Sequence, residues 1–291
     1  YISDMKINGI NGQPKILNVW LFLIVQITFK MISLDQVKKK EIIGQGNFCE
    51  TFRVEDKDQK SYAAQVFYVD YEDYEKSRQY QMERTMFLAT DLDHPAILKG
   101  YDYSLTGFGK EHRPSILFDY LPNGSLEKCI PQLDETKKII NLFGIATAMK
   151  NLHQNYILHY DLKTSNVLET NEYYPKLKHI KYSKVFDSLT SIAKVHKFNV
   201  NIAPETCISN EYTKKSEVYA FAYLAYEVVL NKKPFEGLSQ FEMMTKITKG
   251  ERPELPIDMS TLYKIIIDRC WSQEPKDRPS FLEICQVLQH H

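Results

Sequence analysis

The stretch that decides the fold reads HYDLKTSNVL and covers residues 159–168 of the 291-residue chain. It brings a carboxylate (Asp161), an ammonium group (Lys163) and an amide (Asn166) into one short segment. Before about residue 120 the chain carries short β-type runs, whereas the patterns on both sides of this stretch are helical. The sequence therefore predicts an α+β fold, with a β-rich lobe, a mainly α lobe and a cleft between them.

The β-type runs are KEIIGQG, TFRVED, SYAAQVFYV, ILKGYDYSL and PSILFDYL, separated by turn-forming or charged residues. A polar stretch with helical periodicity, from about residue 71 to 92, interrupts them. After a turn at PNG, ETKKIINLFGIATAMKNLHQ repeats apolar residues at helical spacing. Further helical patterns are SEVYAFAYLAYEVVLN, LSQFEMMTKITKG, STLYKIIIDRCW and SFLEICQVLQ. We expect an N-lobe over about 35–119 and a C-lobe over about 124–291.

The composition excludes several classes of protein. With 43% apolar and 25% charged residues the chain is ordinary globular material. Its 37 basic and 37 acidic residues leave no overall charge excess that would favour nucleic acid as a partner. Five cysteines occur without C-x-x-C pairs, so we expect neither zinc nor a disulfide framework, and reduced thiols suit a cytoplasmic protein.

Residues 1–34 form an extension that contains an uncharged apolar run at 16–29. The run is shorter than the ~20 residues that a membrane-spanning helix needs. Three interpretations stay open: a membrane anchor, a strand or helix packed on the domain, or sequence upstream of a natural start at Met31. A basic segment and a small-residue cleavage site are both missing, which argues against a secretory signal.

Taken together and in order, the motifs of residues 35–291 resemble those of a protein kinase, and they are most similar to the tyrosine-kinase-like branch. GQGNFCET resembles the glycine-rich loop, YAAQV the third strand, HPAIL the start of the fourth strand and LFDYLPNGSL the hinge. HYDLKTSNVL resembles the catalytic loop, APE the end of the activation segment, SEVYAFA the central helix and CWSQEPKDRPSF the closing helix. The resemblance implies the bilobal kinase fold.

The resemblance also assigns roles to individual residues. It implies that Asp161 accepts the proton of a substrate hydroxyl, that Lys163 lies beside the transferred phosphate and that Asn166 is a magnesium ligand. The positions that resemble nucleotide contacts are Ile43, Gly44, Gly46, Ala63, Gln65, Asp119, Leu121 and Leu168. The positions with structural roles are His159, Glu205 and Arg278, the last two as a buried ion pair.

Two departures from the kinase pattern remove charge and metal binding. Gln65 stands where the lysine that neutralises phosphates is expected, and an amide supplies no charge. His179 stands where the D-F-G aspartate would hold magnesium, and Lys181 follows two positions later. A neutral imidazole is a poor ligand for this hard cation. We hypothesise that Lys181 partly replaces the missing charge; a lysine that points into solvent is the alternative.

Further departures affect the nucleotide roof, the helix glutamate and the substrate side. Cys49 occupies the third glycine position and Thr51 that of the valine that usually covers adenine. Tyr160 replaces the arginine that clamps a phosphorylated activation segment, and Phe198 replaces a substrate-facing threonine. The glutamate that pairs with the family's lysine falls on one of two positions. Ungapped counting selects Thr85, and a two-residue shift selects Glu83.

Three functions follow from these residues. The first is a catalytically impaired pseudokinase, with weak or absent ATP and magnesium binding, whose partner is another kinase or signalling protein. The second is an active serine/threonine kinase that uses Asp161 and Asn166 and a relocated lysine. The third is a membrane-tethered kinase-like adaptor anchored through residues 16–29.

Overall fold

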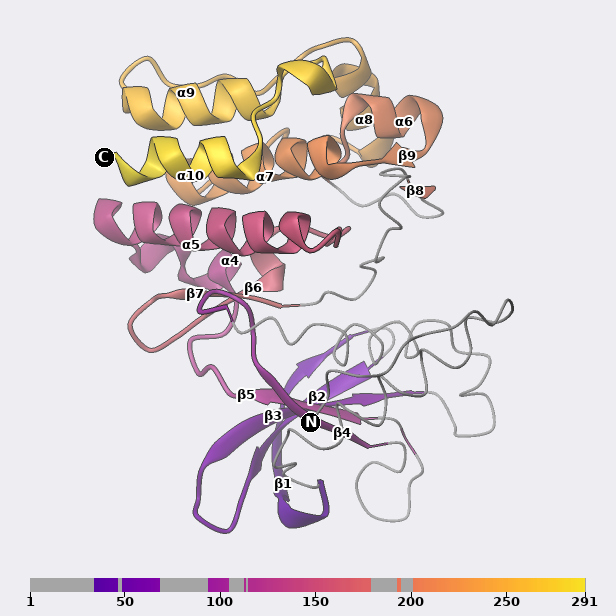
Figure 1. Cartoon of the computed structure of the whole chain (residues 1–291), viewed down its shortest axis with the longest axis vertical. Coiled ribbons are helices and arrows are strands. Elements are labelled where there is room, and N and C mark those ends of the chain that lie inside the picture. Colours follow the sequence, from indigo (N-terminus) through magenta and orange to yellow (C-terminus); the bar gives the residue numbers. More distant parts are fainter. Residues whose placement is uncertain are drawn as a thin grey trace, which may run out of the picture.

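A computed structural model describes residues 34–46, 49–68, 94–104, 113, 115–178, 193–194 and 201–290. These residues form two lobes, with a β-sheet at one end and stacked helices at the other (Figure 1). The predicted bilobal α+β fold is therefore confirmed. The apolar run at 16–29 and the predicted helix at 71–92 lie outside the described residues, and within the described part no helix is long and apolar enough to cross a membrane.

The N-lobe is one antiparallel sheet in which the strands follow the order β1-β2-β3-β5-β4. The central strand β3 is almost wholly buried, whereas the edge strand β1 is exposed along most of its length. Aromatic and aliphatic residues of this sheet, including Phe52, Val54 and Leu117, form the core of the lobe. The strands are β1 Lys38–Gln45, β2 Cys49–Glu55, β3 Ser61–Phe67, β4 Gly100–Ser104 and β5 Ser115–Asp119.

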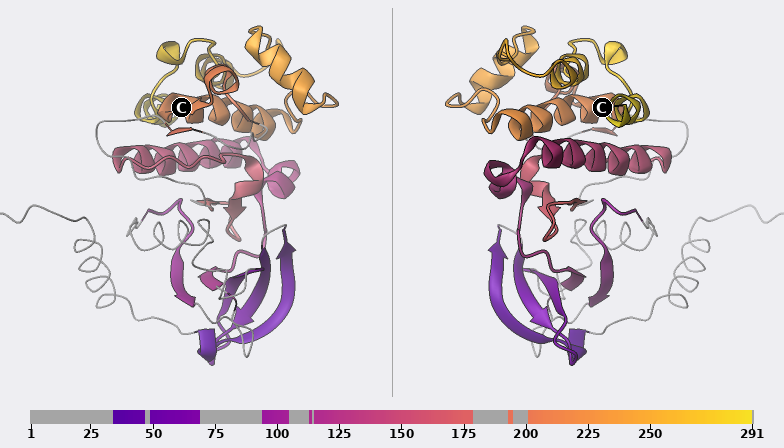
Figure 2. Two further views of the ribbon diagram at one scale, coloured as in Figure 1. Left: turned by 90° about the vertical axis from the view of Figure 1, so that its right-hand side faces the viewer. Right: turned by 90° about the vertical axis from the view of Figure 1, so that its left-hand side faces the viewer.

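The C-lobe is built from helices that pack around a buried central helix, α7 (Figure 2). Its helices are α4 Leu126–Cys129, α5 Glu135–Gln154, α6 Pro204–Ser209, α7 Lys214–Leu230, α8 Gln240–Thr248, α9 Thr261–Cys270 and α10 Phe281–Gln289. Its short strands are β6 Val167–Glu169, β7 Pro175–Leu177, β8 Ala193–Lys194 and β9 Glu211–Tyr212. Short 3-10 turns cover Leu34–Gln36, Ile130–Gln132, Thr164–Asn166 and Pro275–Asp277.

Local sequence explains where these helices begin. Asp134 accepts a hydrogen bond from the Lys137 backbone N–H, which satisfies one of the free donors at the start of α5. Thr213, Ser239 and Ser280 each form a reciprocal capping box at the start of α7, α8 and α10. Because α7 is buried on all faces from Ser216 to Tyr226, it is stable only inside the lobe, where it becomes the support for the loops around it.

The two lobes are joined by backbone hydrogen bonds as well as by the chain. The Leu98 N–H donates to the Leu177 carbonyl at 2.9 Å, and the Leu177 N–H donates to the Ala96 carbonyl at 2.8 Å. Gly144 on α5 lies against Pro175, and a Cβ on this glycine would fall 2.6 Å from Pro175 Cγ. A side chain at this position would therefore push β7, and with it the strand contact to the N-lobe, away from α5.

Candidate functional site

The catalytic-loop stretch lies between α5 and β6 and is anchored by a buried histidine. The His159 ring has no exposed surface. Its Nδ1 accepts from the Asp161 N–H at 3.3 Å, so Nε2 carries the proton and donates to the Lys178 carbonyl at 3.0 Å. Burial lowers the pKa of His159, which keeps the ring neutral. The histidine thus fixes the backbone on both sides of the loop.

Asp161 is held by one oxygen and leaves the other available. Its Oδ2 accepts from Asn166 Nδ2 at 2.7 Å and lies 3.0 Å from Lys163 Nζ. The same Asn166 amide donates to the Asp161 backbone carbonyl at 2.8 Å. Asp161 Oδ1 is buried and has no hydrogen-bond partner among the described residues. A carboxylate with one fixed and one unoccupied oxygen is arranged to accept a proton from a hydroxyl.

Glu217 on α7 supports the loop from below. Its carboxylate is fully buried; Oε1 accepts from the Tyr160 N–H at 2.7 Å and Oε2 lies 2.7 Å from His153 Nε2. Tyr160 has a left-handed backbone with a φ of 67°. Its ring stacks on Tyr212 of β9, with centroids 4.8 Å apart. The loop is therefore fixed to α5, α7 and β9 at once.

The position on β3 that is predicted to face phosphates is neutral and already has a partner. Gln65 is 6% exposed, and its Nε2 lies 2.8 Å from the Sγ of Cys49 at the start of β2. Thr51 lies opposite Gln65 in the β2–β3 register. The three departures from the kinase pattern at Cys49, Thr51 and Gln65 are therefore next to one another. The amide supplies a hydrogen-bond donor but no positive charge.

The two glycines of GQG are not required by the fold itself. A Cβ on Gly44 would lie 3.7 Å from Thr51 Cβ, and one on Gly46 would lie 3.6 Å from the Cys49 carbonyl oxygen. These are ordinary contacts, and neither glycine is among those with a positive φ. The glycines are therefore explained better by the close approach of a ligand than by local backbone conformation.

The remaining predicted nucleotide-contact positions lie on β1, β3, β5 and β6 and at the junction of the lobes after β5. Ala63 of β3 is paired with Phe118 of β5. Asp119 Oδ1 accepts from the Tyr101 hydroxyl at 2.6 Å, and the Leu121 carbonyl accepts from the Gly124 N–H in the PNG turn at 3.2 Å. On either side of this junction Leu168 is half-buried in β6, where it bridges to Ser125, and Ile43 is exposed on β1.

For the phosphate end of a magnesium nucleotide, the described residues supply hard oxygen ligands but no cation at position 65. Gln65 lacks the charge, and the loop offers the oxygens of Asn166 and Asp161 as hard ligands. In the described part of the chain no three His, Cys, Asp or Glu side chains gather into a metal site. The predicted positions His179, Lys181, Phe198, Glu83 and Thr85 all lie outside the described residues.

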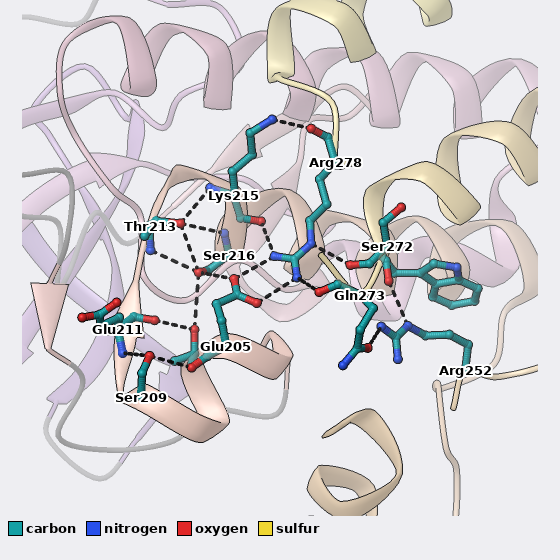
Figure 3. Close-up of polar contacts among 12 residues, drawn as sticks. Glu205, Ser209, Glu211, Thr213, Lys215, Ser216, Arg252, Ser272, Gln273 and Arg278 are labelled. Atoms are coloured by element: carbon teal, nitrogen blue, oxygen red, sulfur yellow. Dashed lines mark hydrogen bonds and ion pairs between the residues drawn. The ribbon is translucent and has the colours of Figure 1, made fainter. Parts of the chain in front are cut away.

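The predicted Glu205–Arg278 ion pair is present in the C-lobe (Figure 3). Arg278 Nη1 and Nη2 lie 2.7 Å and 2.8 Å from the two Glu205 oxygens, and the guanidinium also donates to three backbone carbonyls. The Arg278 side chain is fully buried and lies over the Tyr219 ring. This bidentate pair ties α6 to the segment before α10.

Sequence reasoning missed a buried polar pair beside the loop. Asn141 of α5 and Glu169 of β6 are both fully buried, with Asn141 Nδ2 3.5 Å from Glu169 Oε2. Burial raises the pKa of Glu169 to about 8, against smaller opposing effects of Asn141 and Lys137. The alternation of β6 was the available signal, because Glu169 shares the inward face of Val167.

Comparison with known proteins gives one family and several relatives. The family model for protein tyrosine and serine/threonine kinases matches residues 37–288. A probable LIM domain-containing serine/threonine-protein kinase of Dictyostelium discoideum is 29% identical over 276 residues, which are 89% of this chain and 40% of the relative. The RGS domain-containing serine/threonine-protein kinase A of the same organism is 33% identical over 177 residues, 60% of this chain and 16% of the relative. The chain spans less than half the length of these relatives.

Proposed function

This chain belongs to the protein tyrosine and serine/threonine kinase family, and within it we propose a pseudokinase: a kinase-shaped signalling module with impaired phosphotransfer. The observation that carries the proposal is the contact between Gln65 Nε2 and Cys49 Sγ at 2.8 Å. The position from which a lysine would reach the phosphates holds a neutral amide, and that amide is bound to a thiol of the glycine-rich loop.

The lost charge is large enough to matter. At an effective dielectric constant near 20, a cation about 4 Å from a phosphate charge contributes ~4 kcal/mol. Each ~1.4 kcal/mol changes a rate or an affinity tenfold, so the loss of half of that energy would already weaken transfer by more than tenfold. The substitution of His179 for the metal aspartate acts in the same direction, because magnesium supplies further charge stabilisation.

The biological role that fits such a module is binding. We place the chain in the tyrosine-kinase-like branch on its motifs, and we propose that it acts in the cytoplasm on another kinase or signalling protein. The support is that the framework of the C-lobe is complete: the Glu205–Arg278 pair and the Glu217 contacts are formed. These contacts maintain the shape of the lobe whether or not phosphate is transferred.

A second candidate function is an active serine/threonine kinase. It is favoured by the geometry of Asp161, whose Oδ2 is fixed by Asn166 and Lys163 while Oδ1 has no partner among the described residues. The printed names of the relatives also describe serine/threonine kinases. In this candidate Asp161 accepts the substrate proton, and Lys181 supplies the charge that Gln65 lacks.

Thermal unfolding of the purified chain with ATP, with and without magnesium, is the first test. A site filled at ~100 times its dissociation constant gains ~2.7 kcal/mol of stability. For this chain we expect ATP to raise the stability by less than ~2.7 kcal/mol, and we expect magnesium to change that gain little. A phosphotransfer assay with a general substrate and magnesium or manganese is the second test. Turnover that disappears in Asp161→Asn would establish the active kinase and overturn the pseudokinase.

A further inference from the structure

Two tyrosines lie face to face where the catalytic loop meets β9. The ring centroids of Tyr160 and Tyr212 are 4.8 Å apart, and the ring planes differ by 16°. Tyr212 is buried and Tyr160 is half-buried. Aromatic pairs at this separation contribute energy beyond the area that they bury. The contact therefore links the residue just before Asp161 to a strand that is distant from it in sequence.

The backbone of Tyr160 needs such support. Its φ of 67° lies in the left-handed region, which bulky side chains rarely adopt and which persists where surrounding contacts enforce it. The Tyr160 N–H donates to Glu217 Oε1 at 2.7 Å. Burial, with the negative charge of Glu217 nearby, raises the pKa of the Tyr212 hydroxyl well above the usual value. Glu217 thus holds the backbone of Tyr160 and lies close to Tyr212.

The stack also reaches the segment before α6. Tyr212 pairs with Ala193, so β8 and β9 form a two-stranded sheet next to the loop. The charged groups that act on Tyr212 are the carboxylates of Glu217 and Asp161, and Glu217 acts on Tyr160 as well. A phosphate placed beside these carboxylates would be repelled rather than bound.

We propose that the Tyr160–Tyr212 stack is an aromatic latch that holds the catalytic loop against β9 without any phosphate on the chain. Tyr212 is then a positioning residue for Asp161, acting through Tyr160 and Glu217. The latch consists of uncharged rings and one buried carboxylate, so it is closed as soon as the chain folds. It does not depend on whether the chain transfers phosphate, so its failure would leave the pseudokinase proposal unaffected.

Amide hydrogen exchange of the full chain, treated with phosphatase, tests the latch. The variants are Tyr160→Leu, Tyr212→Leu and their combination, with Tyr212→Phe and Tyr160→Phe as variants that keep the rings. Tyr174→Leu is the control, because Tyr174 is an exposed tyrosine whose ring contacts the Lys137 ammonium. We expect each leucine variant to speed exchange about fivefold to tenfold both at 159–163 and at 211–213, with the double variant little faster than either single one.

The outcomes separate the latch from simple packing. Slow exchange in the untreated and the phosphatase-treated wild type, and in both phenylalanine variants, supports it. Faster exchange at 159–163 after phosphatase treatment overturns it, because the loop would then depend on phosphate. It is also overturned if each leucine variant affects only its own segment and the two effects add. If a leucine variant does not fold, the phosphatase comparison and the phenylalanine variants still decide.

Discussion

The catalytic loop holds the predicted proton acceptor and the β2–β3 strand pair holds the predicted phosphate contact, and the two regions differ in how charge is treated. In the loop, Asp161 Oδ2 lies 2.7 Å from Asn166 Nδ2 and 3.0 Å from Lys163 Nζ, and Oδ1 has no partner among the described residues. In the strand pair, Gln65 is neutral and contacts Cys49. Under the proposed function, the difference implies that proton acceptance and phosphate neutralisation would belong to separate lobes and could be lost separately.

The largest effect should come from the framework that supports the loop side. Replacing Arg278 by Ala leaves Glu205 without its cationic partner and removes donors to three backbone carbonyls. Breaking a buried pair of this kind costs about 3–5 kcal/mol, so urea unfolding should show a loss in that range. Lys233→Ala is the control, because its pair with Glu127 is largely exposed and should contribute less than about 1 kcal/mol. Equal losses in the two variants would contradict the assignment of Arg278 as framework.

The next largest effect should come from Glu169, a buried acid beside the catalytic loop that stays protonated in the folded chain. The pKa of Glu169 is raised to about 8 by burial, so between about pH 4.5 and 8 the folded chain holds a proton that the unfolded chain has lost. Stability due to this group is therefore complete below pH 4.5 and falls as pH rises to 8. Glu169→Gln should remove this slope and should be more stable by about 3 kcal/mol at pH 7.

Urea unfolding at pH 5, 6, 7 and 8 measures the effect. Glu172→Gln, at an exposed glutamate in the turn after β6, is the matched control and should follow the wild-type pH dependence. If Glu169→Gln keeps the wild-type slope, the carboxyl is ionised in the folded chain. The comparison would then change, because the loop side would contain a buried charge that forms no ion pair among the described residues.

The strand side can be tested by restoring its charge. Gln65→Lys places an ammonium where the amide now contacts Cys49, and half of the ~4 kcal/mol estimate for one ion contact is about 2 kcal/mol. Titration calorimetry should then show ATP binding about 30-fold tighter than in the wild type. Gln65→Leu is the control and should bring no gain. An equal gain for adenosine, which carries no phosphate, would show that charge is not the cause.

The sequence predicted the fold, whereas several contacts between residues that are distant along the chain were not predicted. Strand and helix periodicities located most elements, because alternation and helical spacing are local signals. The contact of Gln65 with Cys49 was not predicted, because it depends on a strand register over 16 positions. The Tyr160–Tyr212 stack also joins residues that are distant along the chain. It was not predicted, because Tyr160 was interpreted only as the replacement of the family's arginine.

Buried polar groups were the other limit of sequence reasoning. The helical pattern of 135–154 explained its apolar face, but it gave no sign that Asn141 is fully buried on the same helix. Its neighbour Glu169 follows the catalytic loop in a strand of three residues, so the alternation that signals its burial rests on Val167 and Glu169 alone and is weak. Burial of a single polar residue depends on what packs above it, and only the tertiary structure supplies that.

The smallest effect should come from the loop's own ion pair. Lys163 Nζ lies 3.0 Å from Asp161 Oδ2, but the lysine side chain is 37% exposed, and exposed pairs contribute about 0.2–1 kcal/mol. Lys163→Met should therefore lower the free energy of unfolding by less than about 1 kcal/mol. A loss above 2 kcal/mol in urea unfolding would mean that the loop charges are framework, like Arg278. A small loss would mean that stability does not require Lys163 beside Asp161, and it would favour a retained role in binding or transfer over a role in folding.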